Sequence, residues 1–113
     1  ILVPTYKDIV ALKLILDALQ KQTYKDFEVI VAEDDDSIET KEFLNIYNSH
    51  LDIKHFSHEN KANRKAIILN KSLPYTKGEY LIFIDGDCIP YTTFIESHVK
   101  LSSKKSILCG RRV

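Results

Sequence analysis

Two aspartates that flank one glycine, Asp85-Gly86-Asp87, follow an apolar run and could bind a divalent cation. Ionised carboxylates this close together repel each other unless a cation lies between or beside them. Their hard oxygen atoms suit Mg²⁺ or Mn²⁺, and an incomplete set of protein ligands leaves positions for substrate phosphates and water. Gly86 would let the backbone approach a ligand closely. The alternative is an acidic turn in which the aspartate side chains cap backbone amides. This alternative does not by itself account for two charges at the tip of an apolar strand.

Two other polar segments follow short apolar runs and could contribute to the same site. Tyr6 in Pro4-Thr5-Tyr6 could stack on a ring, although an ordinary strand-to-loop turn accounts for this segment more simply. The acidic run Glu33-Asp34-Asp35-Asp36 could place one or two carboxylates in a cleft, where they would accept a hydrogen bond from a base N–H. The same run could instead serve the positive N-terminal end of the next helix.

The basic residues and the histidines give weaker signals. Arg64 and Lys65 could offset the charge of a diphosphate from the start of a helix, or could be ordinary solvated cations. The four histidines do not show the spacing of a metal site. With three glycines, the chain contains no glycine-rich phosphate loop, which argues against P-loop and dinucleotide-binding proteins.

Apolar runs that alternate with helical periodicity predict the elements that position these groups. We expect strands at residues 1–3, 27–32, 53–56, 80–84 and 106–113, the fourth being the clearest and the third the weakest. We expect a helix after each of the first four strands. Asp8 would cap the first helix, and the third would run over residues 63–73. The second and fourth would begin with capping boxes, formed by Asp36 with Glu39 and by Thr93 with Glu96. This order predicts an α/β fold with a mainly parallel open sheet and helices on both faces. Since ligands bind beyond the carboxyl ends of such strands, we expect the three polar segments to meet there.

The composition fits one domain over residues 1–113, with 44% hydrophobic and 28% charged residues. Sixteen basic residues balance sixteen acidic ones, so no overall field favours nucleic acid or an anionic membrane. Cys88 and Cys109 lack metal-ligand spacing and are more typical of a reduced intracellular chain than of a disulfide framework. No apolar run reaches the ~20 residues that span a bilayer. Because Ile1-Leu2-Val3 already resembles a buried strand, we interpret the sequence as a fragment of a longer protein.

The sequence resembles the family 2 glycosyltransferases over essentially its whole length, most specifically at Gly78–Pro90, which contains an Asp-x-Asp motif in the family's usual setting. Further stretches match in order at Val3–Tyr6, Leu19–Asp34 and Asn63–Ser72. The resemblance implies the nucleotide-sugar-binding half of the Rossmann-like GT-A fold. Two positions depart from the family pattern: the acidic run stands where Asp-Asp-Gly-Ser is usual, and Ala62 stands where glycine is common.

By position, the resemblance implies that Asp34 accepts a hydrogen bond from the nucleotide base, commonly uracil. Asp85 would approach the ribose, and Asp87 would hold the metal that binds the diphosphate. The complete nucleotide-sugar site implied in this way is Pro4, Thr5, Tyr6, Glu33, Asp34, Arg64, Asp85 and Gly86, with Asp85 and Asp87 at Mn²⁺ or Mg²⁺.

The resemblance implies transfer of a sugar from a nucleoside diphosphate, most commonly UDP, to an acceptor hydroxyl of a glycan. The transfer would invert the anomeric carbon and serve polysaccharide or cell-surface glycan synthesis, with the metal neutralising charge on the leaving diphosphate. The carboxylate base is expected beyond residue 113, so no catalytic residue is assigned, and the chain alone should bind nucleotide weakly without turnover. We further expect the isolated chain to form homo-oligomers through uncovered apolar surface. We also expect a cytoplasmic location, at the inner face of the membrane in the full-length protein.

Two other classes of protein share part of the pattern. Haloacid-dehalogenase-like phosphotransferases would use Asp85 as a nucleophile, but their motif follows the first strand, whereas three predicted strands precede it here. A non-enzymatic receiver module would have a phosphorylatable aspartate after its third strand, where this chain has Ser57-His58. Both classes fit the sequence less well than a glycosyltransferase does.

Overall fold

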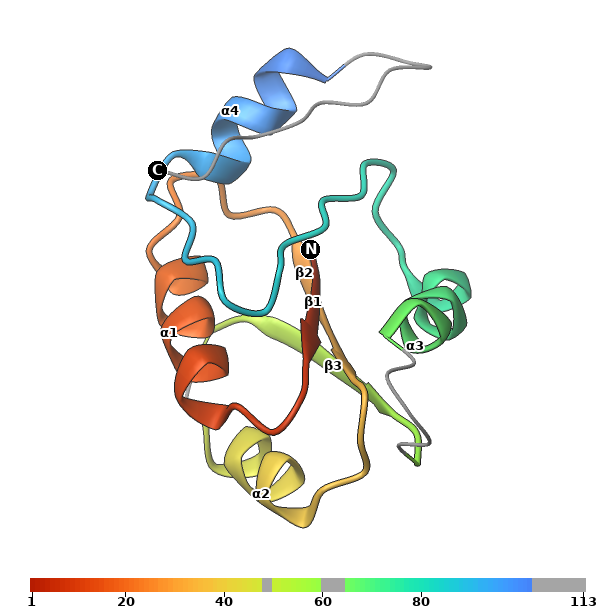
Figure 1. Cartoon of the computed structure of the whole chain (residues 1–113). Coiled ribbons are helices and arrows are strands. Elements are labelled where there is room, and N and C mark those ends of the chain that lie inside the picture. Colours follow the sequence, from red (N-terminus) through yellow and green to blue (C-terminus); the bar gives the residue numbers. More distant parts are fainter. Residues whose placement is uncertain (48–49, 60–64, 103–113) are drawn as a thin grey trace.

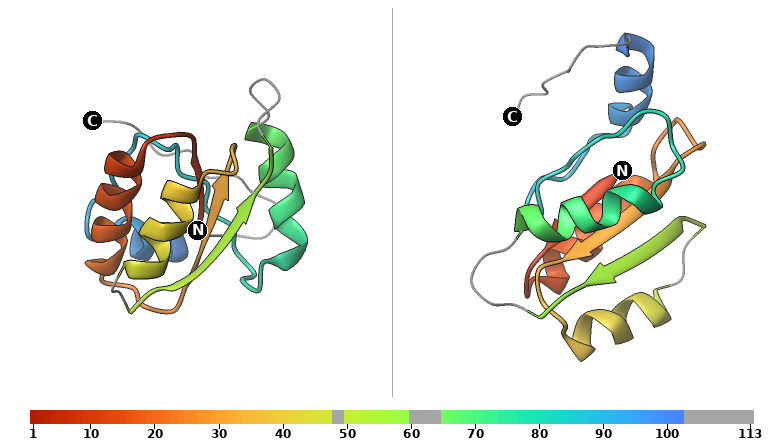
Figure 2. Two further views of the ribbon diagram at one scale, coloured as in Figure 1. Left: turned by 90° about the horizontal axis from the view of Figure 1, so that it is seen from below. Right: turned by 90° about the vertical axis from the view of Figure 1, so that its right-hand side faces the viewer.

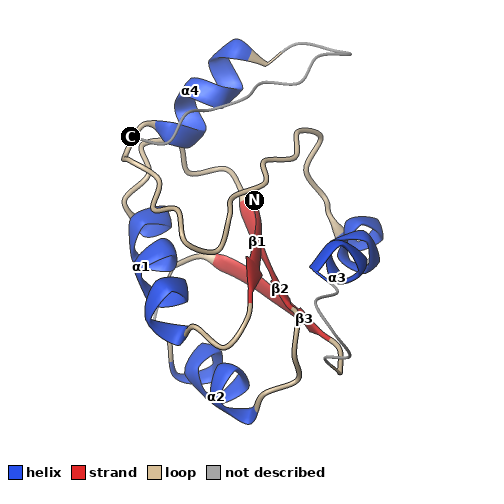
Figure 3. Cartoon of the chain, viewed as in Figure 1, coloured by secondary structure: helices blue, strands red, loops and turns tan. Residues whose placement is uncertain are grey.

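Three parallel strands form the centre of the protein, in the spatial order β1-β2-β3 (Figure 1, Figure 3). They are β1 (Leu2–Thr5), β2 (Glu28–Glu33) and β3 (Asp52–Ser57). The computed structural model describes residues 1–47, 50–59 and 65–102, and it confirms the parallel pairing of these strands. The register pairs Thr5 with Glu33 and Glu33 with Ser57, so the carboxyl ends of the three strands are level.

Helices cover both faces of this sheet, which confirms the predicted α/β architecture (Figure 2). α1 (Ile9–Gln20) and α2 (Ile38–Ile46) lie on one face, and α3 (Lys65–Ser72) lies on the other (Figure 2). A 3-10 turn, η1 (Leu73–Tyr75), follows α3 directly. α4 (Phe94–Leu101) lies toward the amino ends of the strands (Figure 1). None of the described helices is long and apolar enough to cross a membrane.

The core is built around β2, whose residues Val29 to Ala32 are completely buried. This confirms the prediction that the strand is buried on both faces, as its nearly continuous β-branched composition indicates. On one face it packs against the apolar side of α1, formed by Leu12, Ile15, Leu16 and Leu19. On the opposite face, Ile68 of α3 is 1% exposed. Core packing on both faces therefore holds the carboxyl edge of the sheet rigidly.

Residues 80–84 are the clearest strand by sequence, yet the prediction of a full strand there is wrong. The segment pairs with β1 at a single parallel bridge, in which Leu2 N–H donates to Ile82 O at 2.8 Å and Ile84 N–H donates to Leu2 O at 3.0 Å. Ile82 and Ile84 are each 6% exposed, whereas Phe83 is 55% exposed. The apolar run therefore reflects the burial of alternate side chains, which does not require a long ladder of backbone bonds.

The predicted capping box at the start of α2 is wrong. The N-cap is Ser37, whose Oγ accepts a hydrogen bond from Thr40 N–H at 3.2 Å. Asp36 is occupied elsewhere, because its carboxylate lies 2.7 Å from the Lys41 ammonium and accepts a hydrogen bond from Ser57 Oγ at 3.2 Å. Partners on α2 and β3 thus determine the role of Asp36, and they cannot be deduced from local spacing.

Of the other two predicted caps, the one at Asp8 is present and the one at Thr93 is not. Asp8 caps α1 as predicted, since its side chain accepts a hydrogen bond from Ala11 N–H at 3.0 Å. Thr93 precedes α4 but makes no side-chain cap bond, and Glu96 accepts a hydrogen bond from the Thr23 hydroxyl at 2.9 Å. The predicted helix over residues 63–73 is α3, whose first two predicted positions lie outside the described residues. The predicted strand at residues 106–113 also lies outside them.

Candidate functional site

The strand order of the sheet reverses at β1. β2 and β3 are added on one side of β1, and the segment that ends at Ile84 pairs on the other side. Ligands of parallel α/β sheets bind beyond the carboxyl ends of the strands at such a switch point. Pro4-Thr5-Tyr6 and Asp85-Gly86-Asp87 both leave the sheet there, and Asp34 N–H donates to Thr5 O at 2.9 Å. The structure therefore brings the three predicted polar segments to one edge.

Gly86 lies directly against the backbone of β1. A Cβ atom built on Gly86 would lie 2.6 Å from the carbonyl oxygen of Pro4, closer than real Cβ atoms come to other atoms. No glycine among the described residues has a positive φ, so the reason for glycine here is the close approach and not the backbone dihedral. The neighbouring turn is closed by a bond from Cys88 N–H to Asp85 O at 3.1 Å. The absence of a side chain thus allows the acidic loop to rest on the end of β1.

The side chains of this loop form a group of metal-ligand type. One ligand atom each from Asp85, Asp87 and Cys88 lies within 4.8 Å of the other two, and both aspartates are exposed. Two carboxylates on a loop held by a glycine contact suit a hard divalent cation with open coordination positions. The residues present therefore fit the predicted Mn²⁺ or Mg²⁺. Cys88 joins this group through its adjacency to Asp87, a relation that its spacing from Cys109 does not reveal.

Asp34 is held by a histidine that the sequence did not single out. His58 Nε2, just after β3, lies 2.7 Å from Asp34 Oδ1, and the two side chains are 8% and 7% exposed. His58 Nδ1 is buried without a hydrogen-bond partner in the structure. The contact joins residues 24 positions apart, so only the parallel pairing of β2 with β3 reveals it. The predicted base-binding carboxylate is therefore fixed in orientation.

Glu33 serves the scaffold beneath this site. Its side chain is 0% exposed, and its Oε2 accepts hydrogen bonds from Ser37 Oγ at 2.9 Å and Ser37 N–H at 3.3 Å. Its Oε1 lies 2.9 Å from His55 Nε2 on β3. Both carboxylate oxygens are thus bonded within the protein. These contacts tie the end of β2 to the start of α2 and to β3, which fixes the loop that carries Asp34.

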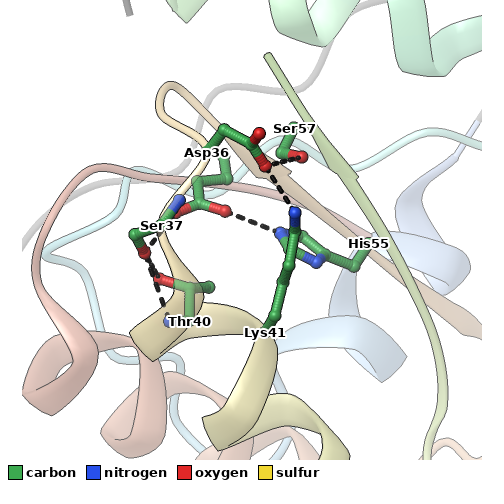
Figure 4. Close-up of polar contacts among 7 residues, drawn as sticks. Asp36, Ser37, Thr40, Lys41, His55 and Ser57 are labelled. Carbon is green, nitrogen blue, oxygen red and sulfur yellow. Dashed lines mark hydrogen bonds and ion pairs between the residues drawn. The ribbon is translucent and has the colours of Figure 1, made fainter. Parts of the chain in front are cut away.

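Asp36 belongs to the outer side of the same network. Its carboxylate faces Lys41 and Ser57 (Figure 4). The hydrogen bond and the charge of the Lys41 ammonium lower the pKa of this carboxyl. Of the acidic run, the first and last members are therefore engaged by structural partners, and Asp34 is the member beside the switch point.

Pro4, Thr5 and Tyr6, the predicted contacts of the base and the ribose, lie at or just beyond the end of β1. Pro4 and Thr5 are buried at the end of β1, whereas Tyr6 is 50% exposed beyond it. Lys7 has a φ of 49°, and its ammonium lies 5.3 Å from the centre of the Tyr6 ring. The Tyr6 ring is therefore accessible to a ligand. Arg64 lies outside the described residues.

A buried amide, Gln22, holds the segment that follows the acidic loop. Its side chain is 1% exposed; its Nε2 donates to Tyr91 O at 2.8 Å, and its Oε1 accepts from Ile95 N–H at 3.1 Å. The neighbouring Thr23 N–H donates to Thr92 O at 2.9 Å. The acidic loop is thus anchored on both sides, by β1 before it and by the end of α1 after it. This role of Gln22 is not evident from local sequence, because its partners follow it by about seventy positions.

The comparison with known families agrees with this geometry. Residues 1–113, the whole chain, match the family described as "Glycosyl transferase family 2". This chain belongs to that family. A solved structure of S. aureus TarS 1–349 in complex with UDP-GlcNAc shares 25% sequence identity and a TM-score of 0.77, covering 88% of this chain and 29% of the TarS chain. The predicted GT-A fold is therefore confirmed.

Relatives with described activities are longer glycosyltransferases. A Campylobacter jejuni GalNAc(5)-diNAcBac-PP-undecaprenol beta-1,3-glucosyltransferase is 32% identical over 77% of this chain and 28% of its own length. An Escherichia coli chondroitin synthase is 29% identical over 89% of this chain and 15% of its own length. The chain thus spans less than a third of either relative. Both relatives are glycosyltransferases, which agrees with the family of this chain.

Proposed function

We propose that this chain binds a UDP-linked sugar together with Mn²⁺ or Mg²⁺, for inverting transfer of the sugar to an acceptor hydroxyl. The observation that supports this most directly is the meeting of Asp34 and Asp85-Gly86-Asp87 at the switch point of the sheet. It offers a carboxylate for a base on one side of β1 and two carboxylates for a cation on the other. A nucleoside diphosphate has these two chemical features at its two ends.

Each end of the donor has its own contacts in this proposal. Asp34, oriented by His58, accepts a hydrogen bond from the base, while Thr5 and Tyr6 border the base and the ribose. Asp85 and Asp87 hold the cation, which supplies charge neutralisation for the departing diphosphate. The chain's own residues bind and orient the donor, and none of the described residues is assigned to deprotonate the acceptor.

The acceptor and the location are proposed from the relatives. The Campylobacter protein and an Escherichia coli glucosyltransferase, WfgD, have names that specify undecaprenol-diphosphate-linked sugars. TarS is a poly(ribitol-phosphate) beta-N-acetylglucosaminyltransferase. We therefore propose a role in cell-surface glycan synthesis, at the cytoplasmic side of a membrane.

The test is calorimetric titration of the chain with UDP, UDP-sugars and GDP, each with and without Mn²⁺. We expect UDP binding that depends on Mn²⁺ and is lost in Asp87→Ala. Asp52→Ala is the matched control, because Asp52 is an exposed aspartate at the amino end of β3, at the opposite edge of the sheet. Equal binding of UDP with and without metal, or equal loss in both variants, would contradict the proposal.

A further inference from the structure

The loop that holds the two aspartates also presents a sulfur atom to the same point. Cys88 Sγ lies 3.5 Å from Asp87 Oδ1, and it belongs with Asp85 and Asp87 to the group whose ligand atoms are within 4.8 Å of one another. Cys88 is partly buried and packs against the core, so its side chain has a defined position. The described part of the chain contains no second cysteine with which it could form a disulfide.

These distances agree with the coordination of one ion. With a metal–sulfur bond of about 2.3 Å and a metal–oxygen bond of about 2.1 Å, two tetrahedral ligands lie about 3.6 Å apart and two opposite ligands about 4.4 Å apart. The observed separation of 3.5 Å between Cys88 Sγ and Asp87 Oδ1 matches the first value. The ligand atoms of the whole group lie within 4.8 Å of one another, so small side-chain rotations suffice to place all three on one ion.

We propose that Cys88 is a third ligand of the cation held by Asp85 and Asp87, so that this site binds thiophilic divalent cations such as Cd²⁺ and Zn²⁺ more tightly than Mg²⁺. This inference rests on the proposed cation site and adds a ligand to it. Thiolate sulfur favours softer cations, whereas Mg²⁺ prefers an all-oxygen set. On binding, the S–H bond of Cys88 breaks, a sulfur–metal bond forms, and the proton passes to the buffer.

The test is a titration of the 113-residue chain with Cd²⁺ in the absence of nucleotide, followed by the ultraviolet sulfur-to-cadmium charge-transfer band. We expect a band that saturates at one Cd²⁺ per chain in the wild type and in Cys109→Ser, and no band in Cys88→Ser. In Asp87→Asn the thiol remains, but Cd²⁺ should bind at least about tenfold more weakly, since even outer-shell partners of a metal contribute about 10–100-fold. Circular dichroism of each variant checks that it is folded.

The outcomes separate this inference from the proposed function. A band that survives in Cys88→Ser, or that is lost in Cys109→Ser, assigns the sulfur to the other cysteine and overturns the inference. Unchanged Cd²⁺ affinity in Asp87→Asn shows a lone surface thiol and also overturns it. Because no nucleotide is present, a failure of UDP binding leaves the band unaffected. Conversely, Mn²⁺-dependent UDP binding by a wild type that shows no band supports the donor site and removes Cys88 from it.

Discussion

Replacement of Gly86 by alanine tests the contact that places the acidic loop on β1. The added Cβ would lie 2.6 Å from Pro4 O, so it must move 0.4 Å to reach 3.0 Å and 0.8 Å to reach the ordinary contact distance of 3.4 Å. The obstacle is a backbone carbonyl in a strand whose neighbours are completely buried, so the loop must move and not the strand. Overpacking of this kind costs about 1–3 kcal/mol, partly offset by about 0.4–1 kcal/mol from the stiffer unfolded chain.

We therefore expect Gly86→Ala to lose about 1–2 kcal/mol of stability, or about 5–10 °C in Tm for a domain of this size. If the loop shifts to relieve the clash, Asp85 and Asp87 move with it, and Mn²⁺-dependent UDP affinity falls instead. Gly78→Ala is the matched control, because its nearest atom, Tyr80 O, would lie 3.6 Å from the new Cβ.

The assay combines urea unfolding with calorimetric binding of UDP and Mn²⁺, on both variants and the wild type. We expect Gly78→Ala to match the wild type within about 0.5 kcal/mol or to be slightly more stable. Equal stability and equal affinity of Gly86→Ala and Gly78→Ala would show that the close approach to Pro4 O imposes no constraint on the loop.

Two further predictions concern groups distant from the metal. Gln22→Ala should lose about 2–4 kcal/mol in urea unfolding, because it leaves the buried Ile95 N–H and the part-buried Tyr91 O without their partner. Each such unpaired group costs about 1–3 kcal/mol. Gln20→Ala, on a less buried amide, should lose clearly less. Tyr47 has its pKa raised to about 12 by burial and by its hydrogen bond to Asp17, so the stability it contributes is complete below about pH 10 and is lost as the pH rises toward 12. Urea unfolding should show this loss in the wild type and a smaller one in Tyr47→Phe; equal losses would contradict the assignment.

The elements that the sequence predicted best are those with local causes. α1 follows from a capping aspartate at residue 8 and apolar residues at helical spacing, and both features act within a few turns of chain. β2 follows from a continuous β-branched run that suits burial on two faces. Where a distant group competes, local rules failed: Asp36 is bonded to Lys41 and Ser57, so Ser37 caps α2 in its place.

The residue types of the site are evident from the sequence alone: two aspartates around a glycine, an acidic run, and a Pro-Thr-Tyr turn, each after an apolar segment. The family resemblance is likewise visible in the sequence, and the whole-chain match confirms it. Three contacts follow from the fold and not from the residue types: Gly86 rests on Pro4 O, His58 holds Asp34, and Gln22 anchors the far side of the loop. These contacts join segments far apart in the chain, and they arise from the register and order of parallel strands. The placement of Cys88 beside the carboxylates is likewise a result of the turn between Asp85 and Cys88, which residue types alone do not specify.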